Sequence, residues 1–412
     1  MSLLIRHARI LTLAQPKTDA NGASGVRPRR GVAMRDLGVI ARGDVLVAEG
    51  KIAAVGTELA VPSDAEVIEA DGRVLMPGFI DCHTHACWVG DPLDEWTQQL
   101  SGGASRAEIE KRGGGIHATV RAVREATRKQ LAASLHTRLD LMLRAGTTTV
   151  EVKSGYGLTL EGELKMLQAI QRVKMEWPGT IMPTALLGHV IEGDPAVYTR
   201  MVVREMLPAI WHEFPGIAID ACCDEGAWPV EACLRLFERA HKHGLPLRLQ
   251  ADQFGPTGMI PEALKLFARS IDGLENASKA DLLALAATNT IGVMTPATSF
   301  HLGMRYPKAG AFVDSGGLLA LASNYNPHTA PTFSMPLVIA LGVRACGLTP
   351  AEAITACTVN AAAVLGLTDR GAIEPGLRAD LILLRHRDER LLAHEFGGNP
   401  VDSVISAGQK IG

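Results

Sequence analysis

Between about residues 76 and 367 the chain alternates short apolar runs with longer amphipathic ones. Eight strand candidates can be counted, at residues 74–83, 147–154, 181–190, 217–223, 246–252, 270–275, 291–295 and 318–324. Helix candidates follow most of them, at 117–145, 161–177, 196–212, 228–243, 279–288, 331–346 and 350–365. This alternation predicts an α/β fold, a (β/α)8 TIM barrel, with a doubly wound open sheet as the alternative. No GxGxxG motif or P-loop follows any strand, which argues against a nucleotide site.

The two ends of the chain share a different texture. Residues 1–75 contain short β segments separated by Gly, Asp and Pro, and residues 368–412 resume the same pattern. We therefore expect a small composite β-sandwich domain built from both termini. In this division, residues 1–75 and 368–412 form the small domain and residues 76–367 form the barrel.

Charge and hydropathy exclude several classes of partner. The 41 basic and 44 acidic residues give a net charge of −3, so neither nucleic acid nor an anionic membrane surface is an expected partner. No apolar run approaches the ~20 residues that span a bilayer, and Arg6, His7 and Arg9 interrupt the first apolar stretch. The seven cysteines are sparse and odd in number, which favours packed, reduced thiols without disulfides. A cytoplasmic protein is expected.

Polar residues gather where the predicted strands end. In a TIM barrel the carboxyl ends of the strands carry the chemistry, and polar groups there are hard to explain as core. The residues in question are His83, His85, Glu151, Lys153, His189, Asp224, Glu225, Gln250, Asp252, Gln253, Asp272 and Asn324. This clustering is the main functional signal in the sequence.

His83 and His85 end the first barrel strand. Residues i and i+2 of a strand point the same way, so both imidazoles can reach one point. Such a pair is a ligand arrangement for zinc, iron or a similar ion. Two polar rings at a strand end, with no metal between them, are the plain alternative.

The surrounding strings carry a family resemblance. PGFIDCHTH at 77–85 resembles the first metal motif of the amidohydrolase superfamily. Further strings match, in order and over nearly the whole chain, those of imidazolonepropionase-like members: GGGIHATVRAVREAT, AGTTTVEVKSGYGLTLEGELKML, LQADQ, NYNPHTAP and TVNAAAVLGLTDRGAIEPGLRADLILL. The resemblance implies a (β/α)8 barrel with a composite β domain, in agreement with the strand count.

The resemblance also implies a metal site, from which this chain departs. Such enzymes hold one Zn or Fe ion by the HxH pair, a His ending strand five and an Asp ending strand eight. His83 and His85 match, whereas Gln250 stands for the strand-five His and Asn324 for the Asp. Gly273 replaces a catalytic His of strand six.

Amides bind transition metals weakly compared with imidazole or carboxylate, because they are neutral. A divalent ion, zinc or iron, is therefore expected to be weakly held or absent. Gln253 and His189 are the candidate catalytic residues that remain at family positions.

The substrate side is partly retained. By resemblance, Tyr156, His189, Glu225 and Asn326 face or support the substrate. A family Arg that follows Gly-Asp is Pro92 here, and a family Tyr is Arg106. Since an Arg binds a carboxylate bidentately and Pro cannot, Arg106 is a candidate replacement for the lost cation. An exposed Arg at a helix start is the alternative.

Three functions follow. The first is an imidazolonepropionase-like amidohydrolase with a degraded metal site, hydrolysing a non-peptide C–N bond of a small cyclic amide or amidine. The second is a catalytically silent relative that binds a small ligand. The third is an imidazolonepropionase of histidine degradation whose site is rebuilt by His301 and His328, two histidines outside the family pattern. The family expectation for assembly is a homodimer.

Overall fold

The computed structural model describes residues 2–14 and 25–411. Eight parallel strands follow one another around a barrel in chain order, each hydrogen-bonded to the next. They are β6 (Phe79–Asp81), β7 (Thr147–Lys153), β8 (Thr180–Gly188), β9 (Ala218–Cys223), β10 (Leu247–Ala251), β11 (Ser270–Gly273), β12 (Ile291–Met294) and β13 (Leu319–Leu321). Each lies within or next to one of the eight predicted runs.

Contacts between the first and last strands close the barrel. The amide of Ser323 donates to Asp81 Oδ1 (3.1 Å), and that of Asn324 donates to the carbonyl of His83 (3.1 Å). A parallel bridge then joins Thr84 to Tyr325. The closed (β/α)8 barrel is thereby confirmed over the open sheet.

Helices surround the barrel, and three of the predicted ones are interrupted. The predicted helix 117–145 is two helices because Thr127 leaves the helical conformation and caps the second one through a capping box with Gln130. A π-helical turn, Val202–Met206, divides the predicted helix 196–212, and a break after Ala356 divides 350–365. The helices of the barrel region are α1 (Leu93–Leu100), α2 (Arg106–Lys111), α3 (Ile116–Glu125), α4 (Arg128–Arg144), α5 (Leu160–Glu176), α6 (Pro195–Met201), α7 (Leu207–Glu213), α8 (Val230–Lys242), α9 (Met259–Lys265), α10 (Lys279–Ala286), α11 (Pro296–Leu302), α12 (Ala309–Asp314), α13 (Met335–Ala345), α14 (Pro350–Ala356) and α15 (Val359–Val364).

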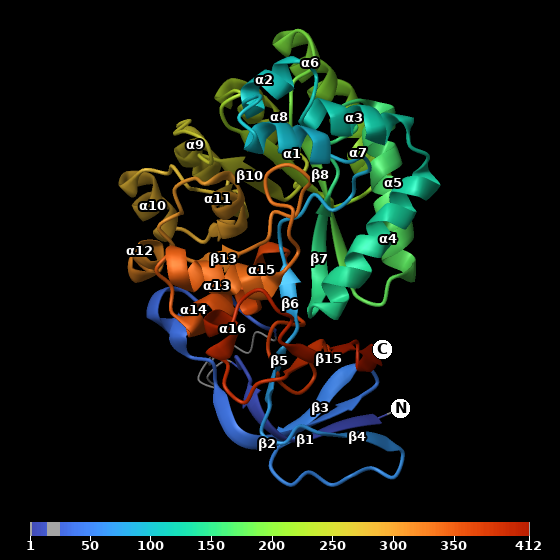
Figure 1. Ribbon diagram of the computed structural model, residues 1–412, viewed down its shortest axis with the longest axis vertical. Coiled ribbons are helices and arrows are strands. Elements are labelled where there is room, and N and C mark those ends of the chain that lie inside the picture. Colours follow the sequence, from blue (N-terminus) through green and yellow to red (C-terminus); the bar gives the residue numbers. More distant parts are fainter. Residues whose placement is uncertain (1, 15–24, 412) are drawn as a thin grey trace.

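Both ends of the chain build a second sheet, as predicted (Figure 1). Strand β5 pairs with β14 in antiparallel fashion, which joins the two ends. A separate hydrophobic core lies between the strands, with Ile5, Val45 and Leu381 buried in it. The strands are β1 (Ser2–Leu11), β2 (Val39–Ala48), β3 (Lys51–Gly56), β4 (Ala65–Glu69), β5 (Val74–Pro77), β14 (Leu381–Leu384), β15 (Val401–Ser406) and β16 (Gln409–Ile411), with a 3-10 turn at Gly31–Arg35 and a short helix α16 (Leu391–His394).

Two further findings concern membrane-spanning helices and cysteines. Within the part that the structure describes, no helix has the length and apolar character needed to cross a bilayer. The seven cysteines are all buried free thiols.

Candidate active site

A cavity of about 140 Å³ lies where the barrel strands end at their carboxyl termini. The sequence-predicted residues that line it are His85, Arg106, Tyr156, His189, Asp224, Glu225, Gln250, Gln253, Asn324, Asn326 and His328. His83 lies outside this lining, 1% exposed, and His301 is also outside it. The structure therefore brings most of the predicted site residues to one small pocket.

Three rings form one wall of this cavity. His85 stacks on His189 with their centroids 5.2 Å apart, and Tyr156 lies 5.3 Å from His189. Burial lowers the pKa of His85 well below its ordinary value and that of His189 to about 4, so both imidazoles are neutral at pH 7. His189 Nδ1 donates to the carbonyl of Gly155 (2.8 Å), which leaves its Nε2 as an acceptor.

The loop that carries Tyr156 is fixed by a buried carboxylate. Glu163, in the first turn of α5, accepts hydrogen bonds of 2.8 Å from the amides of Gly155, Gly157 and Leu158. The same loop presents the Gly155 carbonyl to His189. Sequence analysis missed Glu163, although an acidic residue four positions after Thr159, in a first helical turn, was the available signal.

We expect the substitution Gly157→Ala to destabilise this loop. A Cβ at Gly157 would lie 2.3 Å from the backbone carbon of Gly162, so one of the two segments must move. The expected loss is about 1–3 kcal/mol of unfolding free energy, measured by denaturant titration. Gly398→Ala is the matched control, since its Cβ would meet nothing within 4 Å. Equal stability of the two variants would contradict the close approach.

The two amides at the predicted ligand positions also line the cavity. Gln250, at the end of β10, donates from Nε2 to Gln253 Oε1 (2.9 Å). Asn324 donates from Nδ2 to Thr298 Oγ1 (3.0 Å), and its Oδ1 is buried without a partner among the described residues. Each amide group therefore donates a hydrogen bond to a neighbouring side chain, and its carbonyl oxygen remains available as an acceptor.

His83 is tied to the barrel interior. Its Nδ1 lies 2.5 Å from Asp272 Oδ2, and its Nε2 is buried with no hydrogen-bond partner in the described chain. Arg248 Nη2 donates to the same Asp272 oxygen (2.7 Å). Burial alone would raise the pKa of Asp272, but Arg248 and His83 hold it well below the ordinary value.

The Asp272 pair extends into a buried network of charges. Arg248 also donates to Glu151 (2.9 Å), and Lys153 bridges Glu151 and Asp220. These side chains are at most 1% exposed. Sequence analysis assigned no role to Arg248 or Asp220. Arg248 lies two residues before Gln250 on its strand, and Asp220 lies two residues before Cys222, so each shares the inward face of the strand with that residue.

The donor chemistry decides whether the site fits the metal that the resemblance implies. His83 Nε2 and one His85 nitrogen are available, together with the Gln250 and Asn324 carbonyls. The nearest carboxylate, Asp272, already binds Arg248 and His83 through its Oδ2, so that oxygen is not available to an ion. In residues 2–14 and 25–411, no three His, Cys, Asp or Glu side chains are arranged to hold an ion. This donor set does not fit a tightly held divalent cation.

The two extra histidines do not repair this set. His328 lines the cavity, but its Nε2 lies 2.7 Å from Thr119 Oγ1 and is occupied there. His301 does not line the cavity. The structure therefore gives no support to a metal centre rebuilt from these two residues.

Arg106 does face the cavity. Its Nε donates to Glu110 (2.8 Å), and its guanidinium lies 4.8 Å from the centre of the Phe254 ring. Within the described residues, the two terminal nitrogens have no hydrogen-bond partner, and these contacts hold the cation at the rim. Asn326, by contrast, directs both polar atoms into its own turn, to the Asn324 carbonyl and to Thr329 and His328.

Comparisons with known proteins agree with this architecture. The chain matches the amidohydrolase family model over residues 74–411. It is 41% identical to the imidazolonepropionase of Deinococcus radiodurans, covering 93% of this chain and 96% of that protein. It is 36% identical to the imidazolonepropionase of Geobacillus kaustophilus, covering 99% and 97%.

Solved structures show the same fold at low identity. A triazine hydrolase variant superposes with a TM-score of 0.73 at 17% identity, covering 99% of this chain and 94% of that one. A zinc-bound adenosine deaminase from Xanthomonas campestris gives a TM-score of 0.66 at 18% identity, covering 99% and 92%. With the closed barrel, the composite sheet and these relatives in agreement, the chain belongs to the amidohydrolase family, as an imidazolonepropionase-like member.

Proposed function

We propose that this chain hydrolyses a non-peptide C–N bond of a small cyclic amide or amidine in the cavity at the carboxyl ends of the strands. The observation that carries this proposal is the joint placement of His85, Tyr156 and His189 beside Gln253 in one enclosed pocket. A pocket of about 140 Å³ suits a single small ring. The imidazolonepropionases it resembles support the same reaction class.

Two residues of the pocket, His189 and Tyr156, have different roles in the proposed hydrolysis. His189 Nε2 is an acceptor and takes the proton of the attacking water as the new C–O bond forms. Burial raises the pKa of Tyr156 well above its ordinary value, so its hydroxyl stays protonated and donates to the substrate carbonyl or ring nitrogen. The C–N bond then breaks and the leaving nitrogen takes a proton back from His189.

This chemistry would be slow. A pKa of about 4 makes His189 a weak base, and the donor set described above does not hold a divalent ion firmly. We infer that zinc or iron, where present, is bound weakly, and no step of the reaction is assigned to it. Arg106 at the rim would bind an anionic substituent of the substrate, and Glu225, exposed at the mouth, would disfavour one on its own side.

A hydrolysis screen tests the proposal. Purified protein is analysed for metal and then incubated with hydantoins, imidazolones and lactams. We expect ring opening of at least one compound. In His189→Ala the rate should fall by roughly 100-fold or more, since a general base contributes about 10²–10⁴-fold. His136→Gln, an exposed histidine on α4, is the matched control and should keep full activity. Turnover unchanged in His189→Ala would overturn the assignment.

A second function is favoured by the amides themselves. Gln250, Gln253 and Asn324 retain hydrogen-bonding capacity while lacking the charge that hydrolysis uses, which suits a small-ligand-binding protein without turnover. Protein that is inert toward the whole screen but melts several degrees higher with one compound would support this reading. We further infer a cytoplasmic location and a homodimeric assembly, both of which gel filtration and cell fractionation would check.

A further inference from the structure

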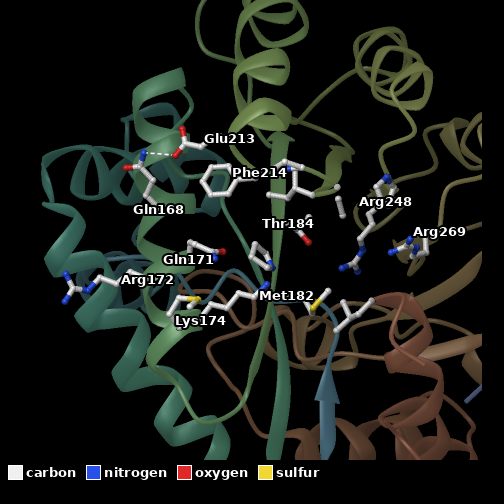
Figure 2. Close-up of a pocket in the computed structure, with 18 of the residues that line it drawn as sticks. Gln168, Gln171, Arg172, Lys174, Met182, Thr184, Glu213, Phe214, Arg248 and Arg269 are labelled. Atoms are coloured by element: carbon white, nitrogen blue, oxygen red, sulfur yellow. Dashed lines mark hydrogen bonds between the residues drawn. The ribbon is translucent and has the colours of Figure 1, made fainter. Parts of the chain in front are cut away.

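A second, larger cavity lies at the other end of the barrel (Figure 2). It has a volume of about 880 Å³ and is bordered by α5 and by the amino-terminal halves of β8, β9 and β10. Met182 and Thr184 of β8 and Arg248 of β10 form its inner end. This is the face opposite to the candidate active site, whose residues follow the carboxyl ends of the same strands.

Positive charge in this cavity is only partly balanced, because its basic residues face a single carboxylate in the lining, that of Glu213, which accepts from Gln168. Arg248 is neutralised from the barrel side by Glu151 and Asp272. Arg269, just before β11, is half-buried and has no hydrogen bond or ion pair from its guanidinium within the described residues. Lys174 of α5 likewise has no such partner there, and Figure 2 places Lys174 and Arg269 on opposite sides of the cavity.

The position of Arg269 is accommodated by a glycine. A Cβ at Gly366 would lie 2.9 Å from Arg269 Nη1, and the φ of Gly366 is +71°, which other residues rarely adopt. Burial and the nearby Arg248 both lower the pKa of Arg269. An unneutralised guanidinium held beside another cation favours the uptake of an anion.

The rest of the lining is mixed, with Gln168, Gln171 and Glu213 on one side and an apolar group of residues near the cations. Phe214 and Pro215 follow α7, and Met182, Pro246 and Leu365 complete the lining near the two cations. Such walls do not suit a fully hydrated inorganic ion, whereas they suit the hydrocarbon part of an organic one. The partnerless guanidinium of Arg269, close to these apolar side chains, favours an amphipathic molecule with a carboxylate at one end.

We propose that this cavity is a second ligand site, which takes a small aromatic or apolar carboxylate between Arg269 and Lys174. The carboxylate accepts from the guanidinium of Arg269, and the apolar part lies against Phe214 and Met182. No bond is made or broken. The site is separate from the hydrolytic pocket, and it stands whether or not the chain is a hydrolase.

The test uses 2-naphthoate and its uncharged analogue 2-naphthamide, with binding to the full chain followed by isothermal titration calorimetry. We expect saturable binding of the naphthoate and about tenfold or more weaker binding of the naphthamide, as a charged hydrogen bond is lost. Arg269→Gln should weaken the naphthoate by a similar factor, and Lys174→Gln, which removes the ammonium on the opposite side of the cavity, should weaken it by less. Circular dichroism and the melting temperature of each variant verify that it is folded.

Arg172→Gln is the matched control, because Arg172 lies on the same helix as Lys174 and at the edge of the same cavity (Figure 2), but its guanidinium already pairs with Glu176. It should bind as the parent does. Arg106→Gln separates the two cavities: binding that falls in this variant and not in Arg269→Gln belongs to the hydrolytic pocket and overturns the proposal. Absence of naphthoate binding to the parent, or equal binding of the amide, would overturn it as well.

Discussion

A Gln250→His, Asn324→Asp variant is expected to bind about one zinc ion per chain, whereas the parent protein is expected to retain far less after dialysis. The reason is chemical, because the barrel already supplies two imidazoles at His83 and His85. Two amide oxygens are exchanged for an imidazole and a carboxylate, which completes a three-His, one-carboxylate set. Elemental analysis after gel filtration and calorimetric zinc titration measure the change.

The backbone at both positions accepts these exchanges. Asn324 has a φ of +54°, a conformation that Asp also tolerates. Gln250 faces the cavity, where a histidine ring replaces a side chain of similar length. The buried Nε2 of His83 and Oδ1 of Asn324, both without partners among the described residues, are the atoms that would face the ion.

Two further variants sharpen this prediction. Adding His83→Ala to the restored protein should abolish the gain in zinc, since one ligand of four is lost. The strand-six position behaves differently: Gly273 has a φ of +97°, and a Cβ there would lie 3.0 Å from the Ala251 carbonyl oxygen. Gly273→His should therefore cost about 1–2 kcal/mol of stability. Zinc content unchanged from the parent in Gln250→His, Asn324→Asp would show that these residues do not converge.

The fold was predictable because its signal is repeated. Eight apolar runs separated by amphipathic helices leave few arrangements open, and each run is recovered in or beside a barrel strand. The helix breaks were harder to foresee. Thr127 ends one helix and caps the next, yet the apolar spacing continues across it, so the pattern predicted a single helix.

The residues of the candidate site could be predicted from the sequence, but the hydrogen bonds and ion pairs between them could not. Strand ends identified His85, His189, Gln250 and Asn324, and all four line one cavity. The partner of His83 depends on which side chains of different strands meet inside the barrel. The register between neighbouring strands places Gln250 beside Asp272 and Arg248 beside Asp220. This register cannot be predicted from the sequence of each strand taken separately.

Replacing Lys153 with Met is expected to destabilise the protein by about 3–5 kcal/mol, the usual cost of removing one partner from a buried ion pair. Lys153 is fully buried and bridges Glu151, at 2.7 Å, and Asp220. Glu151 keeps Arg248 in the variant, but Asp220 loses its ion-pair partner, and its Oδ1 already has no hydrogen-bond partner in the described chain. Denaturant titration followed by circular dichroism measures the loss.

Two comparisons separate charge from packing in this prediction. Lys265→Met removes an ammonium from an ion pair of the same length, 2.7 Å, but one whose Lys side chain is 68% exposed, so it should cost no more than about 1 kcal/mol. Lys153→Met combined with Asp220→Leu removes both members and should recover much of the loss, because no isolated charge remains in the barrel. If the double variant is as unstable as Lys153→Met alone, the loss comes from altered packing of the barrel interior rather than from an unpaired Asp220 carboxylate. The ion pairs among Glu151, Lys153, Asp220, Arg248 and Asp272 would then not be what stabilises the barrel.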